Sequence, residues 1–140
     1  MKKSTFPTPQ DAEAAFYEAL EAGEIEAMME VWAEDEEIVC VHPGGARLAG
    51  YNQIRESWAQ IFGSGQRLRV HVSNPVVLSG MMLAVHSVNE NILVQGESRA
   101  PVTATNVYLR TGNGWRMILH HGSPAPQVPR ASAELPKILH

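Results

Sequence analysis

His42 is the residue whose type and setting most directly suggest chemistry. It follows the short apolar run 38–41 and precedes Pro43-Gly44-Gly45, so the pattern predicts a strand that ends at a turn. An imidazole with an ordinary pKa of about 6.5 can act near neutral pH as a general base or as a hydrogen-bond donor. The alternative is structural: the ring caps the turn and takes no part in chemistry.

Two further polar residues fall inside strand patterns that are otherwise largely apolar. Asn106 is disfavoured in a strand interior, so either a ligand oxygen or a buried neighbour should bind its amide. Glu90 shares a face with apolar residues, where burial would favour its neutral form and allow it to act as an acid or a base. If that face is instead solvated or lies in a dimer, Glu90 and His86 simply pair.

Two adjacent histidines, His120 and His121, end the last predicted strand. Neighbouring side chains of a strand point to opposite faces, so both cannot bind one metal ion without a bulge, and we expect no metal site. Pairing Arg110 with Trp115 would put His121 on the face of Asn106. We therefore expect His121 inside and His120 at the outer surface or against a partner subunit.

The remaining candidates would line the site rather than react. Aromatic side chains at helical spacing belong more often to a core than to a ligand site, and Tyr17 is the exception because its hydroxyl needs a partner. Cys40 lies between two valines and is expected to be a buried, unreactive thiol. The residues expected to contact a ligand are Phe16, Trp32, Cys40, Trp58, Glu90, Tyr108 and His121.

These residues must be positioned by helices in the first half of the chain and by strands in the second. Periodicity predicts helices over 9–22, 25–32 and 51–62 and strands over 38–42, 67–78, 82–95, 102–110 and 115–121. That order predicts an α+β fold in which a strongly curved antiparallel sheet wraps three helices into a cone. A partly apolar concavity with a few polar groups is the usual form of a small-molecule site.

Composition narrows the class of protein. The chain has 140 residues, a net charge of −4 and one cysteine, which predicts a single domain in the reducing cytoplasm. The scattered basic residues argue against nucleic-acid binding, and no apolar run reaches the roughly 20 residues that cross a membrane. The start of the chain lacks the apolar stretch of a secretory signal. We assign 8–126 to the domain and 127–140, with its prolines, to a tail.

Five ordered segments carry a resemblance to a known family: FYEALEAGE at 16–24, VHPGG at 41–45, TNVY at 105–108, GWR at 114–116 and HHGSP at 120–124. Together they are similar to SnoaL-like domains, within the superfamily of nuclear transport factor 2 and ketosteroid isomerase. The end of the chain is also similar to the association (hub) domain of calcium/calmodulin-dependent kinase. The resemblance implies a cone-shaped α+β barrel that dimerises through the outer face of its sheet.

The resemblance also places the catalytic positions of ketosteroid isomerases on this chain. Their catalytic Asp falls at His42, their neutral Asp at Asn106, and their oxyanion-hole Tyr at Phe16, with Tyr17 beside it. Because all three roles are altered, the resemblance does not imply steroid isomerase activity.

We therefore expect a cytoplasmic homodimer that binds a small, largely apolar organic molecule inside its cone. If it is an enzyme, the reaction is an isomerase- or lyase-type proton transfer without metal or cofactor. His42 would then be the base, and Asn106 and Tyr17 the hydrogen-bond donors. The alternative is a non-catalytic ligand-sensing or hub-like oligomerisation module. A third possibility is a structural dimer whose own side chains fill the interior.

Overall fold

The order of elements follows the predicted order, with two short strands added. The computed structural model describes residues 5–125, and the tail predicted over 127–140 lies outside the described residues. The helices are α1 (Pro9–Ala22), α2 (Ile25–Val31) and α3 (Tyr51–Gly63). The strands are β1 (Val39–Val41), β2 (Arg47–Ala49), β3 (Leu68–Ser79), β4 (Leu83–Val94), β5 (Glu97–Ser98), β6 (Val102–Thr111) and β7 (Gly114–Pro124). The short strands β2 and β5 were not expected from the sequence.

Helix α1 is delimited by its own sequence. Thr8 caps the N-terminus by accepting a hydrogen bond from the backbone N–H of Asp11 at 3.0 Å, and Gly23 ends the helix with a φ of 67°. Between these ends, the face that carries Phe16 packs against the sheet and is fully buried there. Glu13 and Tyr17 lie one turn apart on the same helix, which matters for the site described below.

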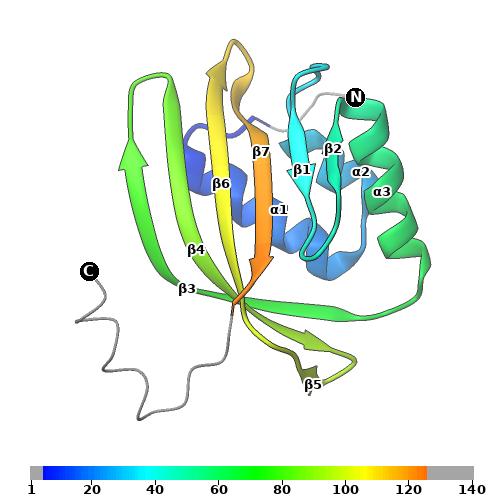
Figure 1. Cartoon of the computed structure of the whole chain (residues 1–140). Coiled ribbons are helices and arrows are strands. Elements are labelled where there is room, and N and C mark those ends of the chain that lie inside the picture. The colour runs from blue at the N-terminus through cyan, green and yellow to red at the C-terminus, as the bar shows by residue number, and fades with distance from the viewer. Residues whose placement is uncertain (1–4, 126–140) are drawn as a thin grey trace.

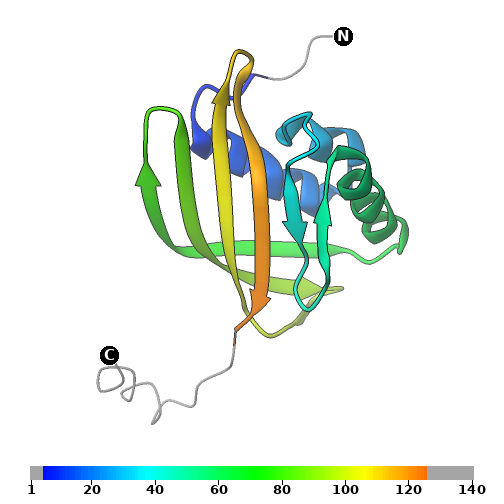
Figure 2. The same cartoon turned by 45° about the horizontal axis from the view of Figure 1, so that its top comes forward.

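The strands form one curled sheet in the order β2-β1-β7-β6-β4-β3, with β5 paired to β4. From α3, strand β3 runs beneath the helices and then turns upward along β4 (Figures 1 and 2). A bulge between Ser73 and Val76 interrupts the pairing of β3 with β4, and a bulge of this kind bends a strand. The sheet thus curls around α1 without closing, which confirms the predicted α+β cone.

The sheet is mixed, whereas the sequence predicted an antiparallel one. Strand β1 runs parallel to β7, with Cys40 opposite His120. The prediction was wrong here because hairpin rules fix the direction only of strands that follow each other along the chain. β1 and β7 are separated by most of the domain, so their relative direction depends on the complete fold.

A second bulge decides which histidine faces the interior. Arg110 pairs with Trp115 as predicted, but Ile118 is an extra residue between the pairs Tyr108–Met117 and Val107–Leu119. His120 therefore pairs with Asn106. His120 is 3 % exposed, and His121 lies exposed on the outer face, so the predicted placement of these two histidines is wrong.

The core lies between α1, α2 and α3 and the concave face of the sheet. Alternation along β4 buries Ala84, His86, Val88 and Glu90, so this face lies inside, which was one of the two alternatives that the sequence left open. Among residues 5–125 no helix is long and apolar enough to cross a membrane. In that same range no group of three or more histidine, cysteine or acidic residues is arranged to hold a metal ion.

Candidate functional site

A buried hydrogen-bond network joins α1 to three strands. The Tyr17 hydroxyl donates to Glu90 Oε2 at 2.6 Å. Asn106 Nδ2 donates to the Tyr17 oxygen at 3.0 Å, and His120 Nδ1 lies 2.6 Å from Asn106 Oδ1. The structure thus brings together residues of α1, β4, β6 and β7 that are far apart in sequence.

Glu13 extends this network toward the surface. Its Oε2 accepts hydrogen bonds from Asn106 Nδ2 at 3.2 Å and from the Tyr108 hydroxyl at 2.9 Å. His86 Nδ1 lies 3.0 Å from the same oxygen, so the pairing of His86 with Glu90, which was the alternative for a solvated or dimer face, does not occur. Hereafter, the interior network means Glu13, Tyr17, Glu90, Asn106, Tyr108 and His120. Sequence reasoning missed Glu13, although its position one turn before Tyr17 on α1 was a usable signal.

The proton positions follow from the pattern of donors and acceptors. Asn106 uses its amide nitrogen twice, toward Glu13 and Tyr17, so its oxygen must face His120 as an acceptor. His120 therefore donates from Nδ1 and carries a lone pair on Nε2. The amide protons of Asn106 and the hydroxyl proton of Tyr17 are thus already bound by protein oxygens, although both residues were predicted as donors to a ligand.

Burial changes the acidity of every titratable group at the centre of the interior network. The pKa of Glu90 is raised by desolvation and by the nearby Glu13, and the hydrogen bond from Tyr17 only partly offsets this. Desolvation and Glu90 raise the pKa of Tyr17 far above its usual value. Desolvation, with smaller effects of His42 and His121, lowers the pKa of His120 to about 3. Tyr17 and His120 are therefore neutral near pH 7.

An aromatic wall of Phe16, Trp58 and His42 adjoins the interior network. The Phe16 ring lies 4.9 Å from that of His120 and 5.7 Å from that of Trp58, measured between centroids. The Trp58 ring contacts His42 edge-on at 4.7 Å and lies 6.3 Å from His120. Trp58 Nε1 is buried and has no hydrogen-bond partner among residues 5–125. Phe16 and Trp58 thus belong to the core, yet they border the polar centre.

His42 faces the interior side of β1, and its ring is held by α3. Its Nε2 lies 2.9 Å from Ser57 Oγ, whose own hydroxyl donates to the Ile54 carbonyl at 2.9 Å. Nε2 must therefore carry the proton, which leaves the lone pair on Nδ1. Burial lowers the pKa of His42. The following turn is closed by the backbone carbonyl of His42, which accepts from Gly45 N at 2.8 Å, and the ring does not cap it.

The other predicted lining residues are distributed over the molecule. Cys40 is fully buried beneath His42, and burial raises the pKa of its thiol to about 12, as expected for an unreactive cysteine. Tyr108 belongs to the interior network through Glu13. Trp32 is buried beside β7, where it borders a pocket of about 260 Å³ together with Arg116. His121 lies on the outer face.

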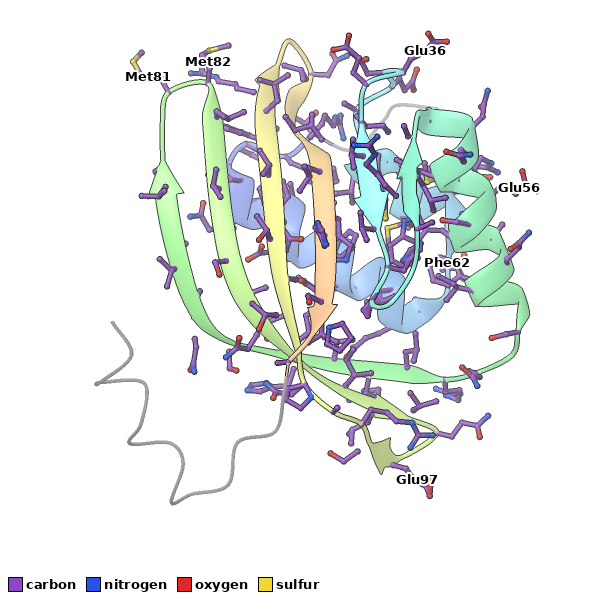
Figure 3. The ribbon with its side chains drawn as sticks, in the orientation of Figure 1. Glu36, Glu56, Phe62, Met81, Met82 and Glu97 are labelled. Atoms are coloured by element: carbon purple, nitrogen blue, oxygen red, sulfur yellow. The ribbon has the colours of Figure 1, made fainter. Side chains whose placement is uncertain are left out.

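A separate groove lies outside the cone. It has a volume of about 960 Å³ and is lined by the acidic residues 34–37 and by residues 49–53 at the start of α3. Glu36 marks its position at one end of the molecule in Figure 3. None of the residues predicted for the site lines this groove.

The sequence profile of the SnoaL-like domain matches residues 10–127. The chain belongs to the SnoaL-like domain family. A solved structure from Thiobacillus denitrificans, named as a calcium/calmodulin-dependent protein kinase type II association domain, is 40 % identical with a TM-score of 0.83. The match covers 88 % of this chain and 99 % of that chain.

Two further relatives match most of this chain, and the first of them supports membership of the SnoaL-like and nuclear transport factor 2-like superfamily. A structure from Streptomyces avermitilis, named as a dehydratase of the nuclear transport factor 2-like family, is 32 % identical with a TM-score of 0.76. It covers 83 % of this chain and 92 % of that chain. The F-box protein SKIP8 of Arabidopsis thaliana is 26 % identical over 110 residues, 77 % of this chain. This chain spans 46 % of SKIP8, less than half of that relative.

Proposed function

We propose that this SnoaL-like domain binds a small organic molecule between the interior network and the aromatic wall. The observation that carries the proposal is the 2.6 Å hydrogen bond from Tyr17 to Glu90, held on its other side by Asn106. A carboxyl group taken out of water costs free energy, and apolar residues of similar volume would fill a purely structural core at lower cost. This arrangement therefore favours a functional role for Glu90.

The reaction we propose is a proton transfer that needs no metal and no cofactor. Burial raises the pKa of Glu90, which makes its carboxylate a stronger base toward a ligand proton. It would take a proton from one atom of the ligand and return it to another, so that the electron pair stays on the ligand and Glu90 ends unchanged. His42 offers a second acceptor through Nδ1, while Tyr17 and Asn106 act as positioning residues for Glu90.

The direct test is a crystal structure, with native mass spectrometry, of the protein purified from its native host. We expect a bound small molecule in contact with Glu90, His120 or Trp58, and we expect Glu90→Gln to retain it at least tenfold less, as for loss of a charged hydrogen bond. The matched control is Glu97→Gln, on β5, whose carboxylate is exposed. An interior without any ligand, or equal retention by Glu90→Gln, would contradict the proposal.

The second candidate function is oligomerisation, and a specific surface favours it. The β3–β4 hairpin exposes a set of large apolar residues: Val76, Val77, Leu78, Met81, Met82 and Leu83. Figure 3 shows Met81 and Met82 at its turn, directed away from the helices. No Asp, Glu, Lys or Arg occurs between Arg69 and Glu90. Contiguous exposed apolar surface without charge is typical of a protein interface.

We therefore expect a homodimer whose interface includes this hairpin and the adjoining outer face of the sheet. Light scattering should give twice the 15.4 kDa mass of the chain. Leu78→Glu should shift it to the monomer mass, because the new carboxylate would be buried without a partner. Asn52→Glu, at an exposed position at the start of α3, is the control and should stay dimeric. A monomeric parent protein would refute the dimer, and a larger assembly would favour the hub-like alternative. We also propose that the protein resides in the cytoplasm, because its one cysteine, Cys40, is a buried free thiol, which suits a reducing compartment.

A further inference from the structure

The interior network presents acceptors to a ligand, because its own donors are already used. Tyr17 donates to Glu90, Tyr108 donates to Glu13, and Asn106 donates to both Glu13 and Tyr17. His120 donates from Nδ1 to Asn106. These hydrogen bonds leave the second oxygen of Glu90 and the Nε2 lone pair of His120 without partners among residues 5–125. Both residues are more than nine-tenths buried.

The interior network holds two carboxyl groups and no arginine or lysine. The carboxyl groups are those of Glu13 and Glu90, and no arginine is hydrogen-bonded to either of them in the described part of the chain. Arg116 is the single buried arginine between residues 5 and 125, and it donates to the carbonyls of Glu30 and Asn113. An anionic ligand would find no arginine or lysine here. Trp58 Nε1 and the ring nitrogens of His86 are buried without hydrogen-bond partners among residues 5–125, but the His86 ring already lies beside the Glu13 carboxyl group. A carboxylate or phosphate is therefore disfavoured.

The aromatic wall complements a cation as well as an apolar group. Phe16 and Trp58 both lie next to His120, with ring centroids 4.9 Å and 6.3 Å from the imidazole. Aromatic faces attract ammonium groups, and Trp does so most strongly. An ionised Glu90 would add a charge-assisted hydrogen bond to the same group.

From this arrangement we propose that the interior selects a protonated amine with a small apolar body. The ammonium group would donate to Glu90 and to His120 Nε2, and the apolar body would pack against Phe16 and Trp58. This inference rests on the proposed function, since it names the ligand class of the same site. It differs from that proposal in excluding ligands whose only polar group is a carboxylate.

The test compares three compounds of matched shape and different charge: 2-phenylethylamine, 2-phenylethanol and 3-phenylpropionate. The readout is the indole ¹⁵N–H signal of Trp58, assigned with the variant Trp58→Phe. The signals of Trp32 and Trp115 serve as internal references, since neither ring contacts the aromatic wall among the described ring pairs. We expect the amine to shift the Trp58 signal with at least tenfold higher affinity than the alcohol, because a charged hydrogen bond is stronger than a neutral one. The propionate should cause no shift.

The variant Glu90→Gln should lower the affinity for the amine at least tenfold and leave the weak affinity for the alcohol unchanged. Glu97→Gln should match the parent protein. The inference is overturned if the amine does not shift the Trp58 signal, or if the alcohol or propionate binds as tightly. If only the alcohol or the propionate shifts the Trp58 signal, the proposed selection of an amine is refuted, whereas the proposed small-molecule site in the cone is supported. A failure of the proposed function itself would be recognised separately, because crystals of the protein purified from its native host would then contain no ligand in the interior.

Discussion

Replacing Trp58 by alanine should lower the free energy of unfolding by about 3–5 kcal/mol, the range found when a large buried aromatic side chain is removed. Trp58 is 3 % exposed and its ring contacts those of Phe16, His42, Phe62 and His120. The substitution would leave these four rings without their common neighbour, and α3 would lose a principal contact with the interior. Urea denaturation at pH 7 measures the effect directly.

Two controls separate packing from other causes. Trp58→Phe keeps an aromatic ring at the position, and the indole N–H has no partner among residues 5–125, so this variant should lose only about 1–2 kcal/mol. Leu93→Ala removes a side chain that is 39 % exposed and should change stability by less than about 0.5 kcal/mol. Equal unfolding midpoints for the parent protein and Trp58→Ala would refute the assignment of Trp58 to the core.

Acidification should destabilise the protein through His120. Its pKa is about 3 in the folded state, against an ordinary value of 6.5, because burial and the neighbouring His42 and His121 oppose protonation. Between these values the unfolded chain binds more protons than the folded one, so stability falls as the pH falls. The expected loss from His120 is about 2 kcal/mol at pH 5 and about 3 kcal/mol at pH 4, relative to pH 7.

The test is the slope of stability against pH, measured by urea denaturation from pH 7 to pH 4. His120→Asn keeps a donor toward Asn106 but cannot be protonated, so its slope should be shallower by the amounts given above. His121→Asn, on the exposed outer face, should keep the slope of the parent protein. The raised pKa of Glu90 acts in the opposite direction, because a folded state that holds its proton more tightly gains stability on acidification. Identical slopes for His120→Asn and the parent would contradict the burial of His120.

The elements and the inner faces of most strands were predictable because they depend on local periodicity. Helix α1 was predicted with its observed bounds, and alternation grouped Glu90 with the residues that share its face of β4, although the sequence left open whether that face is buried. The need of Tyr17 for a hydrogen-bond partner also followed from its chemistry, and that partner is Glu90. Each of these predictions uses residues that are close in sequence or properties of one side chain.

The parts that sequence reasoning missed depend on how distant segments meet. Glu13 lies in a helix rich in acidic residues, and only the approach of β4 and β6 makes its oxygen an acceptor for buried groups. The exchange of His121 for His120 depends on one unpaired residue in β7, and regular alternation contains no signal for it. The parallel pairing of β1 with β7 likewise required the complete fold.

The unpaired residue Ile118 also affects how this domain can change in length. A deletion inside a strand ordinarily moves every later side chain to the opposite face and is not tolerated. Deleting Ile118 would instead restore a regular ladder and keep His120 opposite Asn106. Evolutionary gaps of one residue are therefore expected within this strand, at a place where alignments of sheet proteins seldom contain them.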